Sequence, residues 1–191
     1  MESRERILES AKRLFAKRGF ERTATLAIAH EAGTSESQLV RYFQTKTGLL
    51  QAIFDESWET LNQSIQPVVV GAANAREALV GVLETVIAAF GRDPELAHLL
   101  LFEGRRIRGA SSEVLLSKGF LDFENLLRVL IHRGKKDGSF HPDLNDFAMA
   151  SALLGATEAM IRDRLMARGE FSDEELRAIF FAMLEGFAPH S

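Results

Sequence analysis

Hydrogen-bonding side chains cluster in the segment EAGTSESQLVRYFQTK, residues 31–46, at Ser37, Gln38, Arg41 and Tyr42. At about 100° per residue of an α-helix, Gln38, Arg41 and Tyr42 share one face and Ser37 lies at its flank. An arginine can donate a bidentate pair of hydrogen bonds to guanine and a glutamine can pair with adenine, whereas a tyrosine hydroxyl suits a phosphate. This face therefore has the chemistry needed to contact DNA.

The opposite side of the same helix is predicted to be apolar, with Leu39, Val40 and Phe43. Ser35 is the expected N-cap, and Gln38 three residues later completes an S-x-x-Q capping box. Together with a preceding short helix, capped by Thr23 or Thr25 and closed by Gly33, this segment has the plan of a helix-turn-helix. In that plan the first helix braces the second, whose N-terminal residues face base edges in the major groove.

Helical periodicity continues along the rest of the chain, without a convincing alternating strand pattern. A fourth helix runs towards Pro67, and Asp93 followed by Pro94 introduces a sixth as an N-cap with proline at the first helical position. Ser172 and Glu175 form a capping box for the last helix, which runs to about residue 187. The other helices are expected at about 75–91, 112–135 and 144–168. We therefore predict an all-α protein of about nine helices.

Charge divides the chain into two parts. The net charge is −4, but residues 1–48 hold nine Lys and Arg against six Asp and Glu, whereas residues 49–191 hold fourteen against twenty-one. A basic end suits an anionic partner and an acidic body suits water. We expect an N-terminal domain at 1–48 and a larger helical domain at 49–191.

Composition and motifs argue against several other classes of protein. The chain has no cysteine, which excludes disulfides and thiolate metal sites. Its five histidines have no H-x-x-x-H spacing, and it has neither a Gly-rich phosphate loop nor a nucleophile elbow. The charged N-terminus is unlike a secretory signal, and no stretch approaches the roughly 20 apolar residues that span a bilayer. We expect a cytoplasmic protein that is not an enzyme, uses no metal or cofactor and has no membrane partner.

Residues 4–54 resemble the N-terminal domain of the TetR (tetracycline-repressor) family. The resemblance rests on residues at the family's spacing: Ala11, Leu14, Phe15, Gly19, Phe20, Ile28, Ala29, Ala32, Gly33, Ser35, Leu39, Tyr42, Phe43, Lys46, Leu49 and Leu50. The rest of the chain resembles the family only in its helix count and in the turn before HPDL, at residues 141–144. The resemblance implies a helix-turn-helix domain followed by a ligand-binding and dimerisation domain.

Carried over by position, the resemblance implies that Thr25, Tyr42 and Lys46 touch phosphates, while Ser37, Gln38 and Arg41 face base edges. Two positions depart from the family. Val40 stands where a tyrosine is usual, and Glu36 places a negative charge at the tip of the reading helix.

Several of these side chains have a second interpretation. Glu36 either accepts a hydrogen bond from cytosine N4 or only complements the helix dipole. Gln38 either reads a base or serves only the capping box. Arg41 and Tyr42 on an arbitrary helix would belong to a solvated face, and Lys46 is a common surface residue.

Two helical strips in the larger domain are candidates for a homodimer interface. The small strip is Ala148, Ala152, Gly155 and Ala159, and the large strip is Leu176, Phe180, Met183 and Phe187. Small against large residues on two long helices would give a four-helix interface when doubled. The alternative is that both strips pack inside one subunit, and the resemblance favours the dimer.

The resemblance also implies a small-molecule inducer in the larger domain, whose identity the sequence does not specify. Aromatic and aliphatic residues from three successive helices are candidates for an apolar cavity: Phe90, Leu99, Phe102, Phe120 and Phe123. Such a row can equally be plain core. Thr157, Glu158 and Arg162 are candidates for polar contacts, although Glu158 and Arg162 are spaced to pair with each other.

These features predict a transcriptional regulator, a repressor released from a palindromic operator in double-stranded DNA by a small, apolar ligand. The competing hypothesis is a protein-interaction module that kept the fold and lost specific DNA binding, for which Glu36 is the best sequence evidence.

Overall fold

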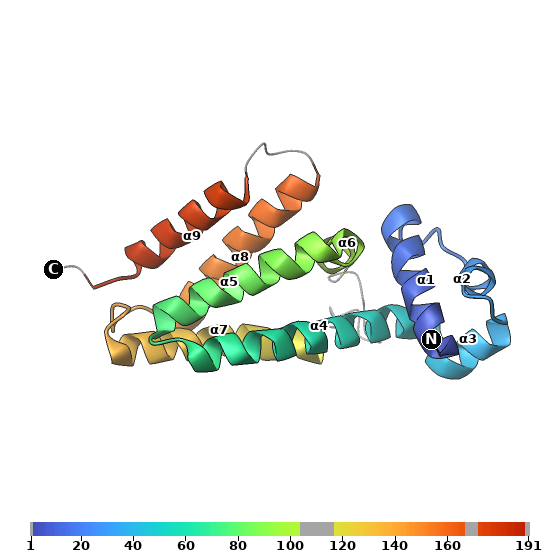
Figure 1. Ribbon diagram of the computed structural model, residues 1–191, viewed down its shortest axis with the longest axis horizontal. Helices are drawn as coiled ribbons and strands as arrows, with labels where there is room; N and C mark the ends of the chain where they lie inside the picture. Colours follow the sequence, from blue (N-terminus) through green and yellow to red (C-terminus); the bar gives the residue numbers. More distant parts are fainter. Residues whose placement is uncertain (1, 104–116, 167–171, 190–191) are drawn as a thin grey trace. The chain divides into compact units, whose positions relative to one another are not determined.

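The computed structural model describes residues 2–103, 117–166 and 172–189, and this part of the chain is helical without a strand (Figure 1). The helices are α1 (Ser3–Arg18), α2 (Thr25–Glu31), α3 (Glu36–Phe43), α4 (Lys46–Gly71), α5 (Ala75–Arg92), α6 (Pro94–Phe102), α7 (Lys118–Asp137), α8 (Asp146–Leu165) and α9 (Asp173–Gly186). The prediction of an all-α protein of about nine helices is confirmed. The predicted start of the seventh helix, at 112–116, and the end of the eighth, at 167–168, lie outside the described residues.

The chain forms two compact units. In the described residues the first unit is 2–59, 92–103 and 117–119, and the second is 60–91, 120–166 and 172–189. The first unit therefore contains α1, α2, α3, the beginning of α4 and also α6, which comes from far along the sequence. The functional boundary at residue 48 remains a prediction.

One apolar core holds the first unit together. The helix α1 packs against α2, α3 and α6, and it supplies core side chains at helical spacing. The core consists of Ile7, Leu8, Ala11, Leu14, Phe15, Ile28, Ala29, Ala32, Leu39, Phe43, Leu49, Leu50, Ile53, Phe54 and Leu99. Both short helices, α2 and α3, thus depend on the same core for their stability, because helices of this length are marginal alone.

The turn between α2 and α3 has the backbone geometry that its glycine allows. Gly33 has a φ of 64°, a left-handed conformation that favours glycine, and the Thr34 N–H donates to the Ala29 carbonyl at 2.9 Å. The Ser35 hydroxyl then accepts from the Gln38 N–H at 3.2 Å and caps α3 as predicted.

Two local predictions about helix ends are wrong. Neither Thr23 nor Thr25 caps α2, because the N-cap is Ala24, without a side-chain hydrogen bond, and the Thr23 hydroxyl is buried and donates to the Gly19 carbonyl at 2.8 Å. The fourth helix does not stop near Pro67 but continues to Gly71. A proline removes one backbone donor, and a helix of 26 residues tolerates this loss near its end.

The second unit contains the end of α4 from Thr60, nearly all of α5 and α7, and α8 and α9, with α8 and α9 packed side by side (Figure 1). Arg177 on α9 donates two hydrogen bonds to the Glu84 carboxylate on α5, at 2.5 and 2.8 Å, and these bonds hold the pKa of Glu84 below its ordinary value. The predicted capping box of Ser172 and Glu175 is present at the start of α9. Among the described residues no helix is long and apolar enough to cross a membrane.

The start of α4 requires a residue without a side chain. A Cβ added at Gly48 would lie 2.3 Å from the Phe43 carbonyl oxygen, whereas a Cβ at Gly71, in the same helix, would meet nothing within 4 Å. We predict that Gly48→Ala lowers the free energy of unfolding by about 1–3 kcal/mol, because the backbone must move. Urea unfolding followed by circular dichroism measures this change. Gly71→Ala is the control, and equal stability of the two variants would contradict the prediction.

Candidate nucleic-acid interface

The helix α3 has one buried side and one exposed side. Leu39 and Phe43 are 0 % and 7 % exposed in the core of the first unit. Glu36, Ser37, Arg41 and Tyr42 are exposed, and Gln38 is half-buried. The predicted polar face therefore lies at the protein surface.

The predicted place of Val40 on the apolar underside is wrong, because Val40 is 47 % exposed. Successive residues of a helix are about 100° apart, so a narrow supporting surface that covers Leu39 and Phe43 leaves Val40 outside it. The exposed side of α3 consequently includes one large aliphatic side chain among polar ones.

Hydrogen bonds hold several side chains of the polar face. The Thr25 hydroxyl donates to the Glu36 carboxylate, and the Thr34 hydroxyl donates to the Gln38 side-chain carbonyl. The hydroxyls of Ser35 and Ser37 lie 2.9 Å apart. These contacts connect α2, the turn and α3.

Two of these contacts bear on the predicted roles. The side chain of Gln38 bonds to Thr34, so the capping box exists only in its Ser35 half. This contact orients the Gln38 side chain. Because a carbonyl oxygen accepts two hydrogen bonds, one acceptor position of Gln38 remains available for a base. A hydroxyl has one donor, so Thr25 cannot donate to a phosphate while it donates to Glu36.

Lys46 has a structural role that sequence reasoning missed. Its ammonium donates to the carbonyls of Phe20, at 3.0 Å, and Glu21, at 3.3 Å, and lies 4.5 Å from the centre of the Phe20 ring. Because an ammonium has three donors, one remains for a phosphate. Lys46 thus ties the start of α4 to the connection between α1 and α2.

Two arginines on α1 brace the C-terminal end of α2. Arg6 donates to the Ala32 carbonyl, at the end of α2, at 3.0 Å, and Arg13 pairs with Glu31. Sequence reasoning did not identify these arginines, because their partners come from a different helix and no local spacing pairs them.

The helix α6 is attached to α1 in the first unit. Lys12 on α1 contacts the Asp93 carboxylate at 2.6 Å, and the same carboxylate caps α6 by accepting from the Leu96 N–H at 2.9 Å. Leu99, predicted to line a cavity, is fully buried in the core of the helix-turn-helix unit. Phe102 is half-buried and stacks against His98, with ring centres 4.5 Å apart.

The other candidate ligand residues belong to the second unit. Phe90 and Phe123 are buried, and Phe120, Thr157, Glu158 and Arg162 are half-buried. Glu158 and Arg162 form an ion pair at 3.5 Å, which confirms the pairing expected from their spacing. Two of the eight candidates, Leu99 and Phe102, thus belong to the first unit and the other six to the second.

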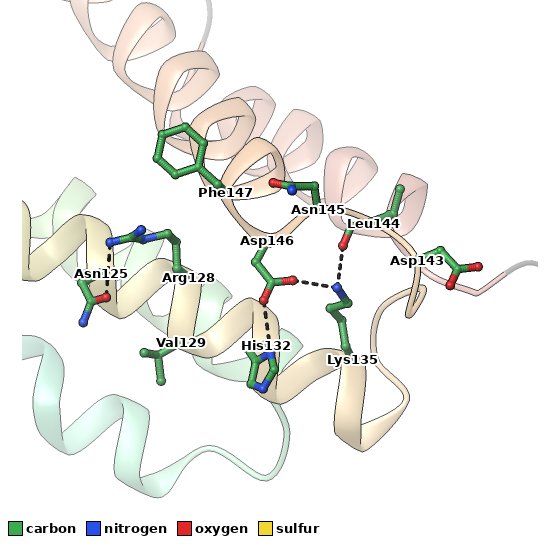
Figure 2. Close-up of a pocket in the computed structure, with 10 residues that line it drawn as sticks. All are labelled: Asn125, Arg128, Val129, His132, Lys135, Asp143, Leu144, Asn145, Asp146 and Phe147. Carbon is green, nitrogen blue, oxygen red and sulfur yellow. Dashed lines mark hydrogen bonds and ion pairs between the residues drawn. The ribbon is translucent and has the colours of Figure 1, made fainter.

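An open groove of about 710 Å³ lies between α7 and the start of α8 (Figure 2). Its lining residues are Asn125, Arg128, Val129, His132, Lys135, Asp143, Leu144, Asn145, Asp146 and Phe147. None of them was predicted to bind a ligand.

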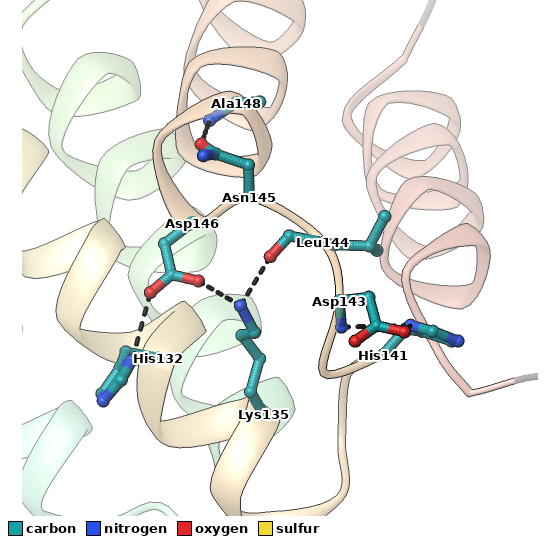
Figure 3. Close-up of polar contacts among 8 residues, drawn as sticks. All are labelled: His132, Lys135, His141, Asp143, Leu144, Asn145, Asp146 and Ala148. Atoms are coloured by element: carbon teal, nitrogen blue, oxygen red, sulfur yellow. Dashed lines mark hydrogen bonds and ion pairs between the residues drawn. The ribbon is translucent and has the colours of Figure 1, made fainter.

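Polar contacts fix one end of this groove. Asp146 accepts from Lys135 at 2.7 Å and contacts His132 at 3.1 Å (Figure 3). The bond from Lys135 holds the pKa of Asp146 below its ordinary value. Asn145 caps α8 by accepting from the Ala148 N–H at 3.0 Å. These contacts join α7 to the start of α8.

The two predicted interface strips differ in accessibility. On α8, Ala148, Ala152 and Gly155 are exposed and Ala159 is half-buried. On α9, Leu176 and Phe180 are 0 % and 5 % exposed inside the single chain, and Met183 is half-buried, as is Phe187 at the C-cap. The exposed large apolar residues of α9 are instead Ile179, at 52 %, and Phe181, at 40 %.

Two short helices around a glycine turn, with the second helix buried on one side and polar on the other, define a helix-turn-helix regulator. The family model described as "Bacterial regulatory proteins, tetR family" matches residues 7–53. This match assigns residues 7–53 to the TetR family, and the described residues have the same fold as a TetR family regulator.

Similarity to other proteins extends over nearly the whole chain. The nucleoid occlusion factor SlmA of Vibrio atlanticus (strain LGP32) is 25% identical over 188 residues, which are 95% of this chain and 93% of that protein. The fold is similar to that of the TetR family regulator PfmR from Thermus thermophilus, with a TM-score of 0.74, 24% identity and coverage of 94% and 97%. It is also similar to AibR, solved with isovaleryl coenzyme A and operator DNA, with a TM-score of 0.76, 21% identity and full coverage of both chains (100% each).

The contacts of Lys46 predict a stability effect. Lys46→Ala should lower the free energy of unfolding by about 1 kcal/mol, because two carbonyls lose a charged donor. Thermal unfolding measures this effect, with Lys17→Ala, an exposed lysine on α1, as the control. If both variants unfold at the same temperature as the wild type, the contacts of Lys46 do not stabilise the connection between α1 and α2.

Proposed function

We propose that this chain is a transcriptional regulator that binds a palindromic operator as a homodimer through α3. The observation that carries the proposal is the division of α3, which buries Leu39 and Phe43 and exposes Ser37 and Arg41. A helix supported in this way can enter the major groove, where its exposed donors meet base edges.

The roles of individual residues follow from their chemistry. Arg41 offers a planar fork that suits guanine O6 and N7, and Gln38, held by Thr34, suits adenine. Tyr42, Lys46 and Thr25 are assigned to phosphates, with Thr25 exchanging Glu36 for a phosphate on binding. Glu36 is assigned either to a cytosine or to the dipole of α3.

A homodimer would place two reading helices on two half-sites. The exposed small residues Ala148, Ala152 and Gly155 on α8 permit close approach of a second helix. The apolar bulk on α9 comes from either Ile179 or Phe181, which lie about 160° apart around the helix axis. This assignment keeps the predicted helices but replaces Leu176 and Phe180, which pack inside the chain. Exposed apolar residues of this kind favour an interface.

We further propose that the regulator is a repressor released by a small, apolar ligand. A released repressor needs a ligand that binds one conformation more tightly than the other. The attachment of α6 to α1 through Lys12 and Asp93 supports such a mechanism, because a shift of α6 would move α1 and, with it, the helix α3 that packs on α1. AibR, with the same fold, was solved with isovaleryl coenzyme A, which supports an acyl group as the apolar part of the ligand.

Nucleoid occlusion is a second candidate function. It is favoured by similarity to the Vibrio factor over 95% of this chain. This candidate also requires DNA binding by α3 but requires no release by a small molecule. DNA affinity that no acyl-coenzyme A changes would favour it over the ligand-released repressor.

Variants of Arg41 test base reading. Arg41→Ala should weaken binding to the preferred palindrome by about 1–3 kcal/mol and relax specificity at one symmetric pair of positions. Arg41→Lys keeps the charge but loses the planar fork, so it should relax the same positions with a smaller loss of affinity. Fluorescence anisotropy with single-base operator variants measures both effects.

Unchanged base preference in both variants would contradict the reading role of Arg41. If the affinity for every duplex is also weak, the protein-interaction module becomes the better hypothesis.

A charge on the small strip of α8 tests the dimer. Gly155→Glu should raise the dissociation constant of the dimer about a hundredfold, because a carboxylate would be buried without a partner. Gly91→Glu is the control, since Gly91 is also helical and exposed, and a Cβ at either glycine meets nothing within 4 Å. Analytical ultracentrifugation measures the constant, and equal behaviour of the two variants would place the interface elsewhere.

A further inference from the structure

The exposed side of α3 contains a single large aliphatic side chain among its described residues, Val40, at 47 % exposure. At about 100° per residue, Val40 lies within about 60° of both Glu36 and Ser37 around the helix axis. Val40 therefore belongs to the same part of the surface as the N-terminal residues that are proposed to face base edges.

We propose that Val40 contacts the C5-methyl group of a thymine and thereby specifies thymine at one symmetric pair of operator positions. This proposal rests on the proposed function, because it requires α3 to enter the major groove. Thymine alone among the four bases presents a methyl group there, and apolar side chains recognise it by contact. Cytosine and the purines present only polar groups or bare ring edges at that place.

The neighbours of Val40 distinguish it from an ordinary exposed aliphatic residue, which needs no explanation. In the absence of DNA the Thr25 hydroxyl donates to Glu36, and the Ser37 hydroxyl lies 2.9 Å from the Ser35 hydroxyl. Val40 thus stands beside side chains that are already oriented at the tip of the helix. A methyl group brought into this place would meet an apolar contact flanked by hydrogen-bonding groups.

The side chain of valine is also suited to this contact. A β-branched residue has one strongly preferred rotamer in a helix, so its methyl groups are presented with little loss of side-chain entropy. Helix stability does not account for valine at an exposed position, because valine is a weaker helix former than alanine, leucine or glutamate.

Replacing thymine by deoxyuridine tests the proposal, since it removes the methyl group and leaves the hydrogen-bonding groups unchanged. The full-length wild-type dimer is titrated with its selected palindrome and with duplexes that carry deoxyuridine at one symmetric pair of thymines at a time. Loss of a buried methyl contributes about a fourfold factor at each half-site, so one pair should weaken binding about fifteenfold.

The same scan with Val40→Ala should show no loss at that pair, while the preference at the position assigned to Arg41 remains. Leu26→Ala is the matched control, because Leu26 is also exposed, at 64 %, but lies on α2. It should keep the wild-type loss. Circular dichroism checks that both variants keep their helices.

Equal sensitivity of the wild type and Val40→Ala at every thymine would overturn the proposal, and so would a selected palindrome without thymine. Both results leave the proposed function intact, because the palindrome itself would be bound. Failure of the wild type to select any sequence would instead overturn the proposed function, and the role of Val40 with it.

Discussion

Burial of Leu39 and Phe43 against α1 and α2 is the contact on which the candidate site depends. An eight-residue helix has too few internal hydrogen bonds to persist alone, so α3 exists because its underside is covered. The same contact fixes the rotation of α3 about its axis. It therefore decides which side chains face the solvent, and so which chemical groups are available to DNA.

Polar contacts further fix the positions of α2 and α3. Ser35 caps α3, Arg6 holds the end of α2, and Lys46 fixes the connection before α2. The contacts of Arg6 and Lys46 join segments that are separated in sequence, whereas the Ser35 cap is local. The reading unit is consequently preorganised, and little conformational entropy remains to be lost when it meets a duplex. The helix α6 belongs to this unit although it follows α5 of the second unit in the chain.

The sequence predicted the parts of the fold that depend on local rules. The caps at Ser35, Asp93 and Ser172 are present because N-capping involves residues within one turn. Val40 was misplaced because periodicity does not reveal the width of the surface that supports a helix. Leu99 was assigned to a cavity because its packing against α1 is a long-range contact that no local pattern encodes.

The side chains of the candidate site show the same limit of local reasoning. Their positions on α3 followed from helical geometry, but the partners of Thr25 and Lys46 did not, since Glu36 and the carbonyls of Phe20 and Glu21 are distant in sequence. Similarly, the spacing on α9 identified an apolar strip, and only the packed structure separates its buried residues from the exposed Ile179 and Phe181.

The most direct measurement of DNA reading by α3 is in vitro selection from a random duplex pool with the purified wild-type protein at physiological salt. At this salt concentration nonspecific binding weakens and specific binding persists. We predict enrichment of one two-fold symmetric motif, with half-sites about one helical turn or a multiple of it apart. No enriched motif, at physiological or at low salt, would contradict sequence-specific DNA binding by this surface.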